Sequence, residues 1–148
     1  MLLSILKSLF LRDLAKLKTE IELYKDEHNL WLIDKQVSNT AGNLCLHLVG
    51  NLNAYIGAEF GKTGYIRNRP LEFSLKDVPR TELLKSIDDA ILMISASFDK
   101  ITEQQLANEY PQEVAAGKVS SGYFLTHLAS HLAYHLGQVN YHRRLLDN

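Results

Sequence analysis

Hydrophobic residues recur at steps of three and four in four long stretches of the chain, which is the spacing of one helix face. The first stretch runs from about Leu2 to Glu27. Additional apolar residues near its start widen this face, so it can cover both an internal core and a subunit interface. The recurring positions are Leu3, Leu6, Phe10, Leu14, Leu17, Ile21 and Tyr24, and the additional ones are Leu2, Ile5, Leu9 and Leu11.

The second stretch follows residues 38–40, Ser-Asn-Thr, which are good N-cap residues. It runs to about Phe60 and stops at Gly61 and Gly64, since glycine commonly ends helices. Its inward side carries two polar residues that an apolar face does not require, His47 and Asn51. The inward positions are Leu44, His47, Leu48, Asn51, Leu52 and Tyr55.

A third helix is expected to begin at Pro79, because proline suits a first helical turn. A fourth helix is expected from the capping residues Ser120 and Ser121 to about Leu146. Residues 62–78 and 102–119 are predicted to be connections, and the best strand candidate is only residues 31–33. The third helix face is formed by Leu83, Ile87, Ala90, Ile91, Ile94, Phe98 and Ile101.

These four stretches predict an all-α protein, a four-helix bundle that occupies residues 1–148 as one domain. A hydrophobic share of 46% supplies enough residues for a core, and a net charge of −1 gives no electrostatic footprint for nucleic acid. No apolar run approaches the roughly 20 residues that span a bilayer, and Lys7, Arg12 and Asp13 interrupt a signal-like start. With Cys45 as the one cysteine, we expect a cytoplasmic protein without a membrane or nucleic-acid partner.

Three histidines in the fourth helix, His127, His131 and His135, are spaced four residues apart. Imidazoles at i and i+4 lie on one side of a helix and can converge on one ion. His131 and His135 fall within the apolar stripe, where two stacked neutral imidazoles need a shared partner, so metal binding is favoured over packing. His127 lies at the flank of the stripe and is expected at a polar rim or behind the metal ligands.

A third ligand is needed, and His47 is the natural candidate because it shares an inward face with apolar residues. Spacing alone does not choose between a ligand and a packing role for His47. Three imidazoles leave a coordination position open for water or substrate, which is the pattern of catalytic metal sites. Asn43 and Asn51 lie one turn either side of His47, and either can orient a ligand.

The fourth helix reads HLASHLAYHLGQ, and His47 stands between two leucines on the second helix. This pattern, over nearly the whole chain, resembles the DinB/YfiT-like superfamily. The resemblance implies a four-helix bundle that binds a divalent metal through His47, His131 and His135, with Gly137 and Gln138 matching the family's Gly-Gln pair. It leaves open whether His127 replaces His135. The metal is expected to be zinc or nickel, with iron, manganese and copper as alternatives.

The same resemblance implies a homodimer and, in some relatives, a metal-dependent transferase that moves a low-molecular-weight thiol onto an electrophile. No thiol-binding motif is visible in this chain, and a hydrolase-like catalyst fits the same site. A non-catalytic metal-binding bundle that acts as sensor, store or scaffold is the first alternative. An interaction module whose histidines are core residues is the second alternative.

Other residues carry weaker signals. Arg67 and Arg69 can bind a carboxylate or phosphate, although a solvated loop is the default interpretation. His28 and His142 are expected to be hydrogen-bonded packing residues. Gly137 costs helix stability, so we expect it to allow close packing of another helix.

Overall fold

The computed structural model describes residues 1–148, and it is all-helical, with no strand. Residues 31–33, the one strand candidate, are therefore not a strand; Trp31 ends a short 3₁₀ helix instead. The α-helices are α1 (Leu2–Leu23), α2 (Ala41–Leu52), α3 (Arg69–Ser74), α4 (Arg80–Phe98) and α5 (Ser121–Leu146). Two 3₁₀ helices (Glu27–Trp31 and Glu103–Ala107) and a π-helical turn (Asn53–Ala58) complete the elements.

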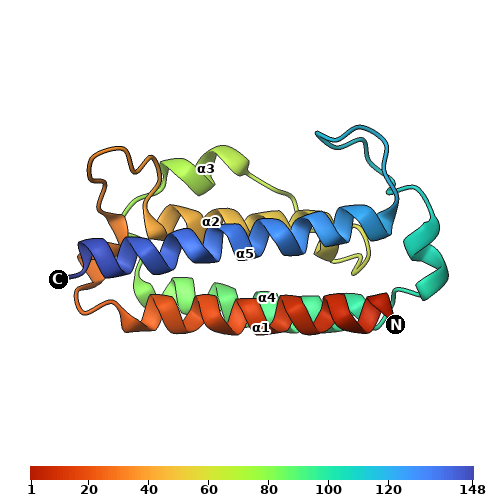
Figure 1. Ribbon diagram of the computed structural model, residues 1–148, viewed down its shortest axis with the longest axis horizontal. Coiled ribbons are helices and arrows are strands. Elements are labelled where there is room, and N and C mark those ends of the chain that lie inside the picture. Colours follow the sequence, from red (N-terminus) through yellow and green to blue (C-terminus); the bar gives the residue numbers. More distant parts are fainter.

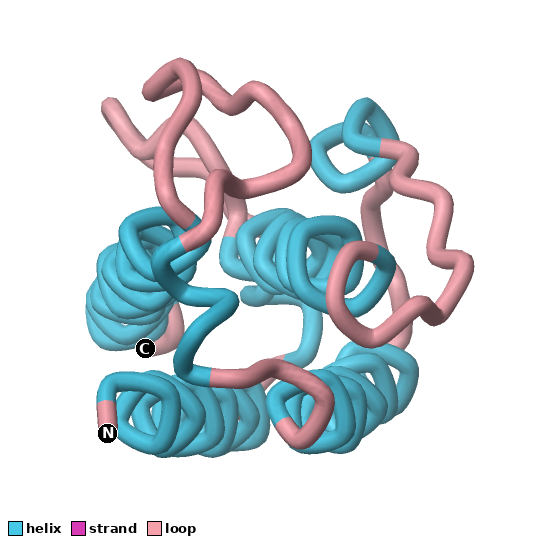
Figure 2. The backbone as a smooth tube through the Cα atoms, turned by 90° about the vertical axis from the view of Figure 1, so that its right-hand side faces the viewer, coloured by secondary structure: helices cyan, strands magenta, loops and turns pink.

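The four long helices lie alongside one another, and the short α3 lies outside them against α2 (Figure 1). Helices α1 and α2 each pack against both α4 and α5. The end-on view shows the four long helices arranged around a common interior (Figure 2). None of these helices has the length and apolar character that crossing a membrane requires.

The interior is one contiguous hydrophobic cluster to which all four long helices contribute. The predicted face of α1 divides into two parts. Its inner residues are fully buried, whereas Leu2 and Ile5, which widen the face, are about half exposed. The inner residues are Leu6, Phe10, Leu14, Leu17 and Ile21.

Helix α1 ends at Leu23, four residues before the predicted end at Glu27. Tyr24 turns the chain into an extended conformation, with ψ at 124°. Its side chain is 2% exposed, and its hydroxyl is 2.7 Å from His142 Nδ1. Burial of this tyrosine therefore stops the helix where the apolar period alone would continue it.

The predicted start signals are confirmed for α2 and α5. Thr40 accepts a hydrogen bond from the Asn43 amide, and Ser120 accepts one from the Tyr123 amide. Past Leu52 the second helix continues as a π-helical turn to Ala58. His47 and the α5 histidines are thus held on long, capped helices, which fixes their backbone positions.

The predicted connection at residues 62–78 contains a helix, α3. Its start uses local signals: Asn68 accepts a hydrogen bond from the Leu71 amide, and Pro70 occupies the first turn. Its end is tied to α2, because Asn43 Nδ2 donates to the carbonyl oxygens of Glu72 (3.0 Å) and Leu75 (2.8 Å). Asn43 therefore anchors α3 above α2 and does not orient a metal ligand.

Candidate metal centre

Three histidines from two helices meet at one point. His131 Nε2 on α5 lies 3.2 Å from His47 Nε2 on α2 and 3.1 Å from His135 Nε2, one turn further along α5. The ligand atoms of all three lie within 4.8 Å of one another. The residues that the sequence pattern singled out are therefore positioned to bind a metal ion.

The proton positions around these rings fit a cation at the centre. His47 Nδ1 is 3.0 Å from Glu72 Oε1, and His135 Nδ1 is 2.6 Å from Gln138 Oε1. Both partners are acceptors, so each Nδ1 carries the proton and each Nε2 presents a lone pair. Imidazoles that bind zinc at 2.0–2.1 Å in a tetrahedron place their nitrogens about 3.3 Å apart, close to the separations found here.

Burial keeps the two central rings neutral. Desolvation lowers the pKa of His47 below its ordinary value of 6.5. Desolvation, followed by the neighbouring His135 and His47, lowers the pKa of His131 to about 3. Neutral imidazole is the form that binds metals, so both rings are in their metal-binding form at neutral pH.

A buried ion pair between Arg67 and Glu72 contacts the Nδ1 side of the His47 ring. Glu72 on α3 is 6% exposed, and its carboxylate accepts hydrogen bonds from Arg67 Nη2 and Arg67 Nε, both at 2.9 Å. The same carboxylate accepts a hydrogen bond from Nδ1–H of His47. Arg67 is therefore part of the site, and the default interpretation of a solvated loop is wrong for this residue. Carboxylates in this position orient a histidine ligand and raise its basicity.

Gly50 allows this carboxylate to approach. A Cβ atom at position 50 would lie 2.0 Å from Glu72 Oε2 and 2.7 Å from Glu72 Cδ. Real Cβ atoms essentially never make such contacts, so the present position of Glu72 requires glycine on α2. Gly50 follows His47 by three residues and so lies on the same side of α2. This glycine is the one feature of the sequence near His47 that could have indicated that another side chain packs closely against the helix there.

Two residues that support the site, Glu72 and Gln138, were not predicted to do so from the sequence pattern. Glu72 is 25 residues from His47 in the chain, within a segment expected to be a connection. Gln138 follows His135 by three residues, a spacing at which side chains on a helix meet, so this pair was recognisable in principle.

His127 and Asn51 lie beside the three histidines without joining them. His127 is exposed, stacks on His131 with ring centroids 6.4 Å apart, and is not among the converging ligands. Asn51 is 6% exposed, and its Oδ1 has no hydrogen-bond partner. His131 Nδ1 is likewise buried without a partner. The structure thus brings His135, not His127, to the centre, and leaves an unpaired acceptor and an unpaired ring nitrogen close by.

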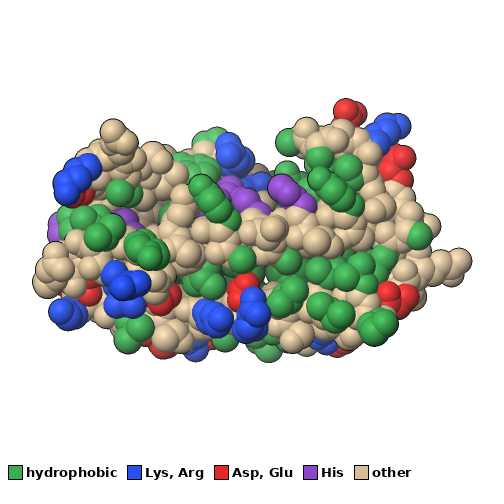
Figure 3. All heavy atoms as spheres, in the orientation of Figure 1, with side chains coloured by type: hydrophobic (Ala, Val, Ile, Leu, Met, Phe, Trp, Pro, Cys, Tyr) green, Lys and Arg blue, Asp and Glu red, His purple; other side chains and the backbone are tan.

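Histidine and basic side chains gather in a hollow between the region of α3 and the raised loop before α5 (Figure 3). A cavity of about 240 Å³ opens beside the histidines. Its polar wall is formed by His47, Asn51, Arg67, Arg69, His127 and His131. Its other wall is formed by Tyr55, residues 114–116, Phe124 and Leu128.

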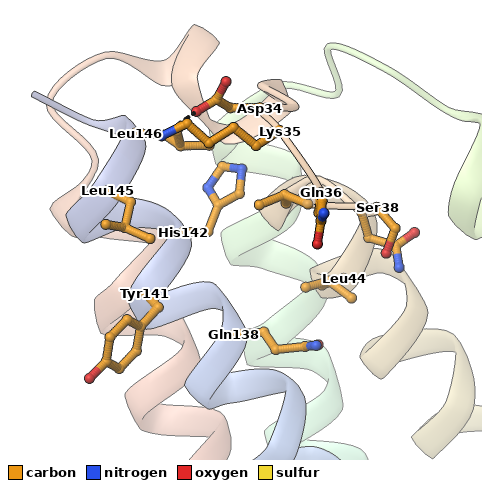
Figure 4. Close-up of a pocket in the computed structure, with 12 residues that line it drawn as sticks. Asp34, Lys35, Gln36, Ser38, Leu44, Gln138, Tyr141, His142, Leu145 and Leu146 are labelled. Carbon is orange, nitrogen blue, oxygen red and sulfur yellow. Dashed lines mark ion pairs between the residues drawn. The ribbon is translucent and has the colours of Figure 1, made fainter.

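A second cavity, of about 420 Å³, lies at the C-terminal end of α5 against residues 34–39 (Figure 4). None of the three converging histidines lines it. Gln138 lines it and also accepts the hydrogen bond from His135, so this side chain separates the second cavity from the metal centre. The smaller cavity is therefore the one that the metal ligands themselves reach.

Of the remaining histidine predictions, one is confirmed and one is wrong. His142 is buried, its Nε2 donates to the Leu32 carbonyl at 2.8 Å, and its Nδ1 accepts from the Tyr24 hydroxyl. His28 is exposed and does not pack in the core. The prediction for Gly137 is also wrong, since a Cβ there would meet nothing within 4 Å on the exposed side of α5.

The model of one protein family matches residues 3–148, and that family is described as "Protein of unknown function (DUF1572)". No curated protein matches the chain. The match covers nearly the whole chain, including all three converging histidines, Glu72 and Gln138.

Proposed function

Because the chain belongs to the DUF1572 family, whose description assigns no function, we propose a function from the site itself: binding of one divalent metal ion through His47, His131 and His135. The convergence of three Nε2 atoms, two of them with their Nδ1 protons held by acceptors, carries this proposal. Zinc and nickel are the first candidates, and iron, manganese and copper are the alternatives, since imidazole suits all but manganese well.

The residues around the ligands have distinct tasks in this proposal. Glu72 holds the Nδ1 proton of His47, and Arg67 compensates the buried charge of Glu72. Gln138 holds the Nδ1 proton of His135.

Metal content tests this proposal. Protein prepared without a histidine tag is analysed by elemental mass spectrometry, with His131→Ala as the test variant and His127→Ala as the matched control one turn away. We expect about one metal per chain in the wild type and the control, and almost none in His131→Ala. Absence of metal from the wild type, or equal metal in both variants, contradicts the proposal.

We further propose that the arrangement is the four-helix bundle of the DinB/YfiT-like superfamily. The packing of α1 and α2 against both α4 and α5 supports this assignment. So does the origin of the ligands, because one histidine comes from the second long helix and two come from the last, as the resemblance implies.

The activity that this assignment favours is transfer of a low-molecular-weight thiol to an electrophile. A bound divalent metal supplies a lowered thiol pKa at neutral pH. The cavity beside His47 and His131 provides room for a small molecule. Loss of free thiol in the presence of a model electrophile such as monochlorobimane, abolished in His131→Ala, is the expected result. Full metal content without turnover favours the non-catalytic alternative.

A homodimer is part of the same proposal. Leu2 and Ile5 extend the apolar face of α1 onto the surface, at 43% and 50% exposure, where a second copy can cover them. Light scattering after size exclusion is expected to give twice the 16.8 kDa chain mass, and Ile5→Glu is expected to give the monomer. The proposed location remains the cytoplasm, which rests on the single cysteine, Cys45.

A further inference from the structure

Residues 62–78, which include α3 and lie between the second long helix and α4, are held outside the hydrophobic core. None of residues 62–77 belongs to the core cluster or is among the half-buried residues packed against it. Glu72 is the one buried residue of the whole segment. A segment with so few buried apolar contacts opens locally more easily than the core helices do. The position of α3 therefore depends on its polar contacts.

Two sets of contacts dock this segment onto α2. In the first set, the Asn43 amide donates to two carbonyl oxygens of the segment, and its Oδ1 accepts from Lys76 Nζ at 2.6 Å. In the second set, Glu72 Oε1 accepts from His47 Nδ1 at 3.0 Å. The ring of Phe73 also lies against that of His47, with centroids 4.9 Å apart. The second set thus ends on a proposed metal ligand.

The segment is built to leave α2 as one unit. The backbone is left-handed at both of its ends, with φ at +54° for Lys62, +76° for Gly64 and +55° for Asp77. The ion pair between Arg67 and Glu72 lies wholly within the segment, so both partners move together. Neither charge is left buried without its partner when α3 moves away, which avoids the main penalty of breaking a buried pair.

The contact between Glu72 and His47 couples the position of α3 to the metal. In the proposed centre His47 binds the ion through Nε2, while Glu72 accepts the hydrogen bond from Nδ1. An orienting carboxylate of this kind strengthens metal binding about 10- to 100-fold. Coupling between two equilibria is reciprocal, so the bound ion strengthens the docking of α3 by the same factor.

We propose that residues 62–78 form a flap that the metal ion holds closed over His47. Loss of the ion is expected to raise the open population of the flap about 10- to 100-fold. Arg67 and Arg69 of the flap line the cavity beside the histidines, so this wall of the cavity is fixed in place while the ion is bound. The proposal describes the regulation of the metal centre and rests on the proposed function.

Hydrogen–deuterium exchange of the full-length protein, with mass spectrometry of peptides that cover residues 69–78, measures the opening of the flap. We expect zinc to slow the exchange of these amides about 10- to 100-fold in the wild type. The 3₁₀ helix Glu103–Ala107 is the internal control, since it is also short and does not line the cavity. Its amides are expected to exchange equally fast with and without zinc.

Two substitutions in the flap separate the two sets of contacts. Glu72→Met removes the acceptor for His47, so the effect of zinc on the exchange of the flap is expected to vanish. The factor lost is expected to equal the factor by which Glu72→Met weakens zinc binding, because the coupling is reciprocal. Lys76→Ala removes a contact with Asn43 that does not reach His47, so exchange is expected to be faster with and without zinc, and the effect of zinc unchanged. Gly50→Ala displaces the same carboxylate without removing it, and the same loss of the zinc effect is expected.

Zinc content of the same samples separates this proposal from the proposed function. Unchanged exchange of the flap at full zinc content overturns the flap and leaves the metal centre standing. Slowing that persists in Glu72→Met and Gly50→Ala, or that is equal in Glu103–Ala107, also overturns the flap, because zinc would then act by general stabilisation. Wild-type protein without zinc overturns the metal centre and, with it, the flap.

Discussion

Replacing Gly50 with alanine tests whether the carboxylate of Glu72 supports the metal centre. The added Cβ would lie 2.0 Å from Glu72 Oε2, about 1.4 Å short of the 3.4 Å at which ordinary contact begins. If the Glu72 carboxylate moves away from the helix by this distance, the hydrogen bond between His47 Nδ1 and Glu72 Oε1, now 3.0 Å long, becomes too long to persist. Loss of such an orienting partner typically weakens metal binding about 10- to 100-fold. The corresponding loss of binding free energy is about 1.4–2.7 kcal/mol.

Stability of the metal-free protein is expected to change in a different way. Alanine in place of Gly50 favours the helix by about 1 kcal/mol, whereas the forced displacement costs about 1–3 kcal/mol. The two terms partly offset each other, so the free energy of unfolding is expected to fall by about 0–2 kcal/mol. Zinc affinity is measured by competition with a chromogenic chelator, and unfolding is measured by urea denaturation in the presence of a strong chelator.

Gly137→Ala is the matched control, because Gly137 also lies in a helix and its added Cβ meets nothing within 4 Å. We expect this variant to be about 1 kcal/mol more stable, with unchanged zinc affinity. Gly50→Ala with wild-type zinc affinity would refute the reasoning, because it would show that the contact with Glu72 does not matter for the ion. A loss in both glycine variants would refute it as well.

Three further predictions concern the surroundings of the site. Gln138→Leu removes the side chain that accepts the hydrogen bond from His135 Nδ1. Zinc affinity, measured by competition with the chelator, is therefore expected to fall about tenfold. An unchanged zinc affinity would contradict the role of Gln138. Burial lowers the pKa of His131 to about 3, so between pH 6.5 and pH 3 the unfolded chain binds a proton at this residue that the folded chain does not. The melting temperature of the metal-free protein is therefore expected to fall as the pH falls from 6.5 towards 3. The fall is expected to be less steep in His131→Ala. His142→Phe leaves the Tyr24 hydroxyl and the Leu32 carbonyl without their partner, so urea denaturation is expected to show a loss of about 2–4 kcal/mol with unchanged zinc affinity.

The helices could be predicted from the sequence because their apolar faces repeat at the helical period over many turns. His131 and His135 followed from the same geometry, since an i, i+4 pair is a local feature of one helix. The end of α1 could not be predicted in this way, because it depends on Tyr24 meeting His142 from the far end of the chain. Such contacts are tertiary, and local periodicity carries no information about them.

The residues that hold the metal ligands in place, Glu72 and Arg67, were harder to predict than the ligands themselves. Helix α3 is only six residues long and is held by Asn43 of α2, so its formation depends on a contact across 29 residues of chain. Without α3, Glu72 and Arg67 look like ordinary charged residues of a loop. Gly137 was misassigned because helix periodicity does not tell whether a neighbouring helix covers a particular glycine.

X-ray absorption at the zinc edge is the most direct test of coordination by His47, His131 and His135. The spectrum of zinc-loaded protein reports the number, type and distance of the coordinating atoms. We expect three imidazole nitrogens at about 2.0–2.1 Å and no sulfur, with the same spectrum for His127→Ala and one imidazole fewer for His135→Ala. A sulfur atom in the coordination shell, or an imidazole lost in His127→Ala and kept in His135→Ala, would contradict this coordination.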